Sequence, residues 1–207
     1  MSVKPELVFD GPAEAERTIV LAHGAGAGMH TPFLSAFATG LSGHGIRVAR
    51  FEFPYMAVFT RTGKKRPPDR EPVLRETWLK VVEMLGRECL VIGGKSMGSR
   101  IASLVADEAD VAGLVCLGYP FHPIDKPDRL RVEHLRTIAT PTLIVQGTRD
   151  PFGTQDEVAG YTLSPSIKVH WLEDGNHDFR PRKVSGRTEE QNWEEAIAVI
   201  AGFVGRL

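Results

Sequence analysis

The residues best suited to chemistry in this chain form the run Gly94-Lys95-Ser96-Met97-Gly98. This run matches the pattern G-x-S-x-G, and it lies between an apolar stretch typical of a strand and a segment with helical periodicity. A sharp strand-to-helix turn would present the serine hydroxyl to a ligand, and the flanking glycines would avoid clashes in that strained turn. The start of the following helix would also favour negative charge nearby. The pattern therefore predicts that Ser96 is a nucleophile.

A serine nucleophile needs a base to accept its proton and an acid to orient that base. Asp150, in VQGTRDPFG, and His177, in WLEDGNHDF, each follow an apolar run that predicts a strand. Alone, Asp150 could be a turn residue before Pro151, and His177 could be an ordinary loop histidine. Together with the turn at Ser96, and in the order Ser, Asp, His, they predict a catalytic triad.

Acyl chemistry further needs donors for the negative charge that develops on the carbonyl oxygen. The backbone N–H of Met97 is one candidate, because this residue follows the nucleophile. The small-residue loop at 23–29, HGAGAGM, offers the second, and we predict Ala25 as the donor with Gly26 beside it. A plain flexible turn is the alternative interpretation of this loop.

A phosphate-binding loop is a competing interpretation of Gly94-Lys95-Ser96. That motif, G-x-x-x-x-G-K-[ST], needs a first glycine five residues earlier, at about the start of the loop. Cys89 occupies this position, so the nucleotide-binding interpretation fails.

The elements that must position these residues alternate along the chain. Apolar runs predict strands and segments of helical periodicity predict helices between them. The predicted strands are 17–24, 46–53, 89–94, 113–118, 142–147 and 167–173, and the predicted helices are 31–41, 71–85, 99–106 and 188–204. Near-continuous apolar strands between helices indicate an α/β fold, a doubly wound and mostly parallel sheet of about six or seven strands with helices on both faces. In such sheets ligands bind beyond the carboxyl ends of the strands, which is where the candidate residues lie.

Length and composition favour one domain spanning 1–207 without a large cap domain over the site. The proline-rich stretch 61–72 is predicted to be a surface loop. A formal net charge of -1 gives no reason to expect nucleic acid or a membrane as partner. With no signal peptide in the first residues and two cysteines, Cys89 and Cys116, in apolar runs, we expect buried thiols and a cytoplasmic protein.

Other side chains are weaker candidates. Tyr55, Tyr119 and Phe121 follow predicted strands and could contact substrate together with Gly26, although loop packing explains them equally well. Lys95 could tune the site electrostatically or simply pack in a loop. Two basic clusters, one within 61–70 and one within 180–183, would attract an anionic substrate if both faced the site, but solvated surface charge is the commoner explanation.

Five segments carry a resemblance to a known family: HGAGAGM, GGKSMGSR, GYPFHP, VQGTRDPFG and DGNHDF. They resemble the compact, capless branch of the α/β-hydrolase superfamily. This branch includes the dienelactone-hydrolase-related proteins, and the chain is most similar to the testis-expressed hydrolase-like proteins and to the hydrolase-like domain of a nonspecific-lethal complex subunit. The resemblance runs from about Arg17 to Leu207 and implies the Ser96–Asp150–His177 triad. Dienelactone hydrolases use a cysteine nucleophile, so their specific reaction is not implied.

The expected activity is that of a carboxylesterase- or thioesterase-like serine hydrolase acting on a small-molecule acyl substrate, with no metal and no cofactor required. The alternative is a non-catalytic hydrolase-like module for protein interaction, as the resemblance to a chromatin-complex subunit suggests. A nucleophile, a base, an acid and a donor loop together count against a pure interaction module, since such a module needs none of them.

Overall fold

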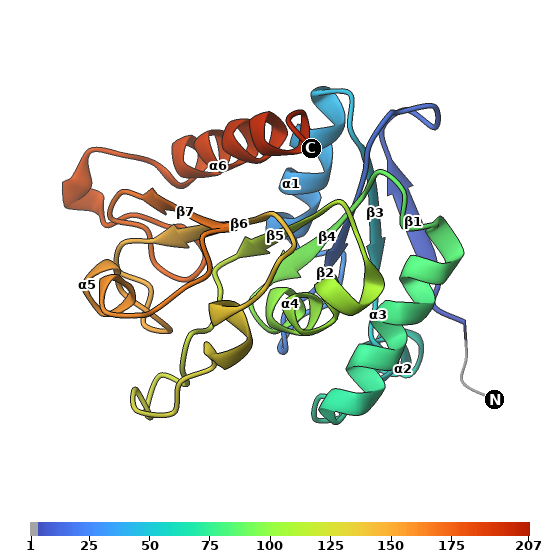
Figure 1. Cartoon of the computed structure of the whole chain (residues 1–207), viewed down its shortest axis with the longest axis horizontal. Helices are drawn as coiled ribbons and strands as arrows, with labels where there is room; N and C mark the ends of the chain where they lie inside the picture. Colours follow the sequence, from blue (N-terminus) through green and yellow to red (C-terminus); the bar gives the residue numbers. More distant parts are fainter. Residues whose placement is uncertain (1–3) are drawn as a thin grey trace.

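The computed structural model describes residues 4–207 and forms a seven-stranded sheet between two layers of helices (Figure 1). The strands lie in the order β1-β3-β2-β4-β5-β6-β7, and neighbouring strands are parallel except for the antiparallel pair of β1 and β3. The strands are β1 (Leu7–Asp10), β2 (Thr18–Ala22), β3 (Arg47–Phe51), β4 (Leu90–Lys95), β5 (Gly113–Leu117), β6 (Thr142–Gly147) and β7 (Ile167–Leu172). The predicted α/β class and mostly parallel sheet are confirmed.

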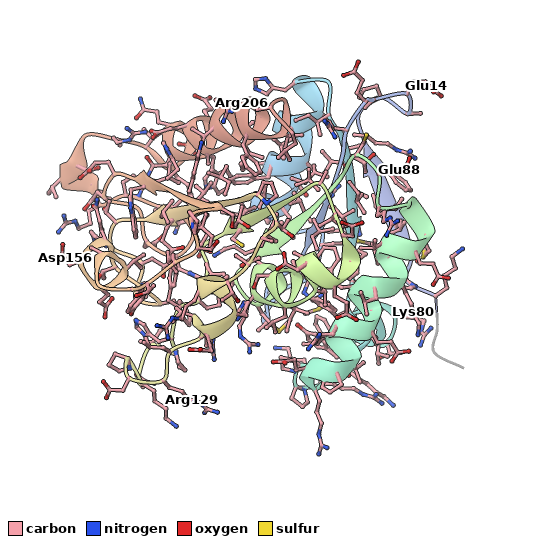
Figure 2. All side chains as sticks on the ribbon, viewed as in Figure 1. Glu14, Lys80, Glu88, Arg129, Asp156 and Arg206 are labelled. Carbon is pink, nitrogen blue, oxygen red and sulfur yellow. The ribbon has the colours of Figure 1, made fainter. Side chains whose placement is uncertain are left out.

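The helices cover both faces of the sheet and enclose two cores. Helices α1 (Pro32–Gly43) and α6 (Glu189–Val204) pack on one face, and α2 (Pro54–Thr62), α3 (Glu71–Leu85) and α4 (Met97–Ala109) pack on the other (Figure 1). The short helix α5 (Gln155–Ala159) and two 3-10 turns, η1 (Glu133–Arg136) and η2 (Lys183–Ser185), lie in the connections. Charged side chains such as Glu14, Arg129 and Asp156 project outward from these layers (Figure 2).

Strand β1 and helices α2 and α5, together with the two 3-10 turns, were absent from the sequence-based expectation. Strand β1 has only four residues and pairs antiparallel at the sheet edge, with Leu7 opposite Phe51 and Asp10 opposite Val48. Helix α2 begins at Pro54, a residue suited to a first helical turn, and ends where Gly63 adopts φ 69°. The predicted surface loop is therefore shorter than 61–72, since only 63–70 lies outside the helices and this segment is largely exposed.

The direction of winding reverses between the neighbouring strands β2 and β4. The chain passes from β2 to β3 on one side and then crosses to β4, β5, β6 and β7 on the other. The ends of β2 and β4 are in register there, with Ala22 paired to Gly94. A reversal of this kind opens a crevice beyond the carboxyl ends of the strands. Loops, and no inserted domain, follow the strands at this edge in the described chain, as expected for a fold without a cap.

The two cysteines differ in environment. Cys116 lies in β5 and is buried, as predicted, whereas Cys89 is exposed. Cys89 lies outside β4 with φ 59°, because the chain turns immediately before the strand starts. The expectation of a buried thiol at this position was wrong. Within residues 4–207, no helix has the length and apolarity needed to cross a membrane.

Candidate active site

Ser96 lies in the turn between β4 and α4 with φ 52° and ψ −116°, a backbone conformation that few non-glycine residues adopt. Its N–H donates to the carbonyl of Leu117 at 2.9 Å, which holds the turn against β5. The flanking glycines are required by close packing on β2. A Cβ at Gly94 would lie 2.2 Å from the Ala22 oxygen, and one at Gly98 would lie 2.6 Å from the His23 oxygen. The strained turn expected from the pattern is therefore present.

Asp150 and His177 meet as the sequence predicted. Asp150 Oδ2 lies 2.8 Å from His177 Nδ1, although the two residues come from the loops after different strands. The carboxylate is fully buried and also accepts from Gln146 Nε2 at 2.9 Å and from the Phe152 N–H at 2.9 Å. Because a carboxylate surrounded by these donors acts as an acceptor, His177 Nδ1 is its N–H donor and Nε2 is left free to accept a proton.

The His177 ring is held from two sides. A Cβ placed on Gly118, which follows β5 with φ 64°, would lie 3.2 Å from ring atoms of His177, so a larger residue there would crowd the ring. The ring of Phe152 packs on the other side with 4.4 Å between ring centroids. Sequence analysis did not identify Phe152 as a site residue. The only sequence feature that could have indicated Phe152 as a site residue is its position two residues after Asp150.

Ser96 and His177 face the same cleft, which has a volume of about 520 Å³. No hydrogen bond joins their side chains in the described part of the chain. Catalytic hydrogen bonds in unliganded enzymes are often long and tighten when substrate binds. The arrangement thus brings a hydroxyl and an oriented imidazole to one open site.

The predicted oxyanion donors are the backbone N–H groups of Ala25, in the loop that lines the cleft, and of Met97, the residue after Ser96. Neither group makes a hydrogen bond to another described residue. Met97 begins α4, so its N–H also carries the positive end of the helix dipole. Gly26 and Ala25 line the cleft, as expected for this loop. The described geometry therefore leaves both predicted donors available to a ligand oxygen.

The small-residue loop is anchored and is not a free turn. His23 Nδ1 lies 2.6 Å from the Gly24 oxygen, and its Nε2 accepts from the N–H of Phe53 at 3.0 Å. The hydroxyl of Tyr55 donates to the carbonyl oxygens of Gly24 and Ala25 at 3.2 and 2.9 Å. Burial lowers the pKa of His23, and the nearby Gly24 carbonyl and Glu52 only partly oppose this effect.

The structure corrects three of the suggested substrate-binding residues. Tyr119 and Phe121 are completely buried, and neither lines the cleft. The backbone of Tyr119 is instead bonded to the amide of Gln146, the residue that also supports Asp150. Tyr55 is buried beneath the loop at 24–28 and supports that loop from outside the cleft. Of the suggested substrate-binding set, Gly26 alone lies in the cleft.

The walls of the cleft come partly from helices α1 and α6, whose contribution sequence analysis missed. The apolar part lies at the start of α1 and on α6, and the polar part lies around the end of β4 and the loop after β7. The apolar lining residues include Pro32, Phe33, Leu34, Phe152 and Trp193, and the charged ones are Lys95, Asp178, Arg180 and Glu189. Trp193 lies on the apolar stripe of the last helix, and helical periodicity alone does not distinguish a core position from a cleft wall.

The two basic clusters do not converge on the cleft. Arg180 lines it but forms an ion pair with Glu189 at 3.1 Å. Arg182 is bonded to Asp174, and Arg61 borders a different cavity. The two clusters would attract an anionic substrate only if both faced the site. The structure does not place both of them there.

Comparison with known proteins places this geometry in a family. Residues 15–205 match the family model described as an alpha/beta hydrolase domain. Similar solved structures include an alpha-beta serine hydrolase homologue from Coxiella burnetii, with TM-score 0.71, 19% identity and coverage of 98% of this chain and 91% of that chain. A serine hydrolase without lid from Xanthomonas campestris gives TM-score 0.70 at 16% identity, covering 98% of this chain and 88% of that one.

A third similar structure is a dienelactone hydrolase from Anabaena variabilis, with TM-score 0.71, 18% identity and coverage of 99% of both chains. Identities this low support the shared lidless fold and do not transfer a reaction. The family model covers residues 15–205, which is nearly the whole chain. This chain belongs to the α/β-hydrolase family.

Proposed function

We propose that this protein is a serine hydrolase that cleaves the acyl bond of a small carboxylic ester or thioester through an acyl-enzyme. The observation that carries the proposal is the 2.8 Å contact of Asp150 with His177 Nδ1, beside a strained serine in the same cleft. This contact leaves His177 Nε2 available as a base in the cleft that Ser96 also lines. Family membership supports a hydrolase, and the residues present supply each part of the acyl-transfer mechanism.

In the first half of the reaction, His177 Nε2 takes the proton of Ser96 as Oγ attacks the acyl carbon. The carbonyl electron pair moves onto oxygen, and the N–H groups of Met97 and Ala25 stabilise that charge. The imidazolium then gives its proton to the leaving alkoxide or thiolate, which leaves the acyl group on Ser96. A water molecule, deprotonated by the same histidine, releases the carboxylic acid in the second half.

The cleft favours a compact apolar acyl or alcohol group. Phe33, Leu34 and Trp193 form its apolar side, and a volume of about 520 Å³ accommodates a small molecule. Only one of the two basic clusters reaches this space, through Arg180, and that residue is paired with Glu189. An anionic group on the substrate is therefore not part of the proposal. The sequence resemblance to chromatin-complex hydrolase-like domains leaves the interaction module as the outcome to be tested.

Labelling with a fluorophosphonate tests the proposal, since this reagent reacts with an activated serine. We expect the wild-type protein to be labelled, and Ser96→Ala and His177→Ala to remain unlabelled. Ser42→Ala, which changes a serine on α1 that donates to Thr39, is the matched control and should label as the wild type does. A folded wild-type protein that does not label, and that hydrolyses none of a panel of short-chain esters and thioesters, would overturn the proposal in favour of the interaction module.

A further inference from the structure

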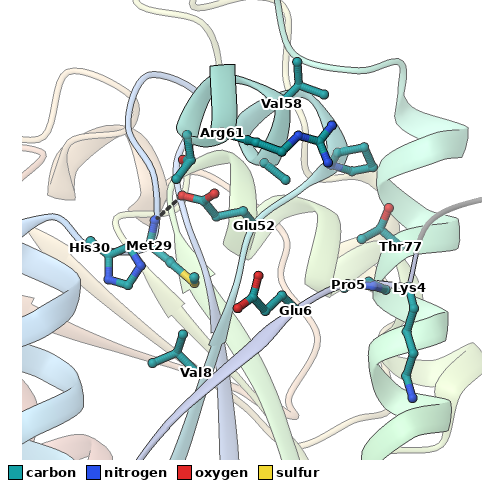
Figure 3. Close-up of a pocket in the computed structure, with 13 residues that line it drawn as sticks. Lys4, Pro5, Glu6, Val8, Met29, His30, Glu52, Val58, Arg61 and Thr77 are labelled. Carbon is teal, nitrogen blue, oxygen red and sulfur yellow. Dashed lines mark hydrogen bonds between the residues drawn. The ribbon is translucent and has the colours of Figure 1, made fainter. Parts of the chain in front are cut away.

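A second cavity, of about 470 Å³, lies beside the loop that borders the catalytic cleft. Met29 and His30 line this cavity, whereas residues 24–28 line the cleft, so the loop borders both spaces. The other walls come from β1, the end of β3, α2 and α3 (Figure 3). Val8, Met29 and Val58 contribute apolar surface, and the volume is within the range of small-molecule sites.

The floor of this cavity carries a buried carboxylate. Glu52 is 8% exposed, and its Oε1 accepts one long hydrogen bond, from the N–H of Met29 at 3.3 Å (Figure 3). Its Oε2 has no hydrogen-bond partner among the described residues. A carboxylate can accept about four hydrogen bonds, so Glu52 keeps acceptor capacity that no described residue uses. The group is therefore suited to a ligand that brings donors and positive charge.

The other charged groups of the cavity do not neutralise Glu52. Glu6 points its carboxylate into the same space, and Lys4 points its ammonium away from both acids (Figure 3). Lys4 and Arg61 are exposed, and within the described chain neither forms an ion pair with Glu52 or Glu6. Since solvent screens the exposed groups, the buried charge that a ligand would meet is negative.

We propose that this cavity binds a small organic cation, with its ammonium group on Glu52 and its apolar body against Val8, Met29 and Val58. The binding itself does not depend on the proposed hydrolase activity. The cation supplies the donors that Oε2 lacks, and the apolar walls exclude the water that would otherwise compete for that oxygen.

Such a ligand acts on the catalytic loop through Glu52, a part of the inference that rests on the proposed function. A Cβ on Gly28, which lines the cleft, would lie 2.2 Å from Glu52 Oε1, so the carboxylate packs directly on this loop. The backbone carbonyl of Met29 accepts a hydrogen bond from Arg50 at 2.9 Å, and Arg50 forms an ion pair with Asp10 at 2.9 Å. A cation bound to Glu52 weakens the hydrogen bond that this carboxylate accepts from the Met29 N–H. The loop is then held less firmly, and acylation of Ser96 becomes slower.

Calorimetric titration of full-length Ser96→Ala protein tests the binding without any acyl chemistry. The probes are phenethylammonium, the neutral phenethyl alcohol and the anionic hydrocinnamate. We expect saturable binding of the cation, at least about tenfold tighter than either other probe, since hydrogen bonds to charged groups contribute about 1.5–3 kcal/mol. No saturable binding of phenethylammonium, or equal binding of the alcohol, overturns the proposal.

Two further variants place the bound cation. Glu52→Gln retains an oxygen for Met29 but loses the charge, and it should weaken phenethylammonium binding by about ten- to a hundredfold. Glu83→Gln, on the exposed side of α3, is the matched control and should bind as the parent protein does. Val58→Trp fills the cavity without changing Glu52 and should abolish binding. Unchanged affinity in folded Glu52→Gln or Val58→Trp protein would mean that the cation binds elsewhere.

The effect on the loop is measured separately, as the rate of fluorophosphonate labelling of wild-type protein with and without phenethylammonium. We expect slower labelling when the cation is bound and no such effect in Val58→Trp. Cation binding with an unchanged labelling rate would overturn the coupling. Absence of labelling at any cation concentration would count against the hydrolase proposal and leave the binding result standing.

Discussion

Lys95 Nζ donates to the backbone carbonyl of His177 at 2.5 Å, so the residue before Ser96, the proposed nucleophile, holds the loop that carries His177, the proposed base. The same ammonium lies 3.2 Å from Asp178 Oδ1, and Lys95 is 8% exposed. Burial lowers its pKa, while the charges of Asp178 and Asp150 oppose that shift. The side chain thus links the strand-to-helix turn to the loop after β7, two segments that are far apart in sequence.

This link predicts that Lys95 positions His177. Lys95→Met should lower kcat for a short ester by about ten- to a hundredfold with little change in KM, because small misplacements of a catalytic group have effects of this size. Lys95→Arg keeps a cationic donor and should recover part of the rate. The pH profile of kcat/KM should move in Lys95→Met, whereas Lys64→Met, on the exposed loop, should match the wild type. Wild-type kinetics in folded Lys95→Met would contradict this role.

Asp150→Asn should lower kcat by about a thousand- to ten-thousandfold with a small change in KM, since an amide no longer holds the imidazole in its active tautomer. The buried side chain keeps its size, and Phe152 can still donate to its remaining carbonyl oxygen. Steady-state hydrolysis measured alongside urea unfolding separates catalytic loss from misfolding. Near-normal turnover by this variant would show that Asp150 is not the acid of the site.

Two glycine-to-alanine substitutions, one beside Ser96 and one at the end of α1, should change the free energy of unfolding in opposite directions. Gly98→Ala should destabilise the protein by about 1–3 kcal/mol, because its Cβ would lie 2.6 Å from the His23 oxygen and the backbone must shift. Gly43→Ala, at the end of α1 with no atom within 4 Å of the added Cβ, should stabilise by about 0.5–1 kcal/mol. Urea unfolding midpoints measure both. Equal effects of the two substitutions would show that the turn is less tightly packed on β2 than described.

His23 predicts a loss of stability on the acid side. Because Nδ1 donates to the Gly24 carbonyl and Nε2 accepts from the Phe53 N–H, the ring is neutral, and a second proton would set two donors against each other. Burial lowers its pKa in the folded protein, so the unfolded chain binds the proton more readily. The stabilisation is fully present above the ordinary histidine pKa of about 6.5 and is lost as pH falls toward the lower folded value.

Urea unfolding at several pH values between about 7.5 and 5 tests this sign around that ordinary pKa. The wild type should become less stable as pH falls, and His23→Asn should show a smaller dependence. His44→Asn, at the exposed end of α1, is the matched control and should keep the wild-type slope. The same slope in wild type and His23→Asn would mean that other groups cause the acid sensitivity.

Local pattern predicted much of this fold because burial on both faces of a parallel sheet leaves an unbroken apolar run in the sequence. Six of the seven strands and four helices were found in this way, with α3 matching at both ends, 71 and 85. Strand β1 was missed because four residues at a half-exposed edge carry no such run. Helix α2 was missed because its two buried residues, Tyr55 and Met56, are adjacent in sequence and so show no helical spacing of apolar residues.

The sequence by itself determined which chemistry the chain is suited to. Ser96, Asp150 and His177 each come within a few residues after an apolar strand, and parallel strands bring their carboxyl ends together. Only the tertiary structure decided where the neighbouring side chains point. Tyr119 and Phe121 follow β5 at the site edge yet turn into the core, while Lys95 reaches His177 and Glu52 reaches Met29. These directions depend on contacts between segments distant in sequence, and local periodicity does not specify them.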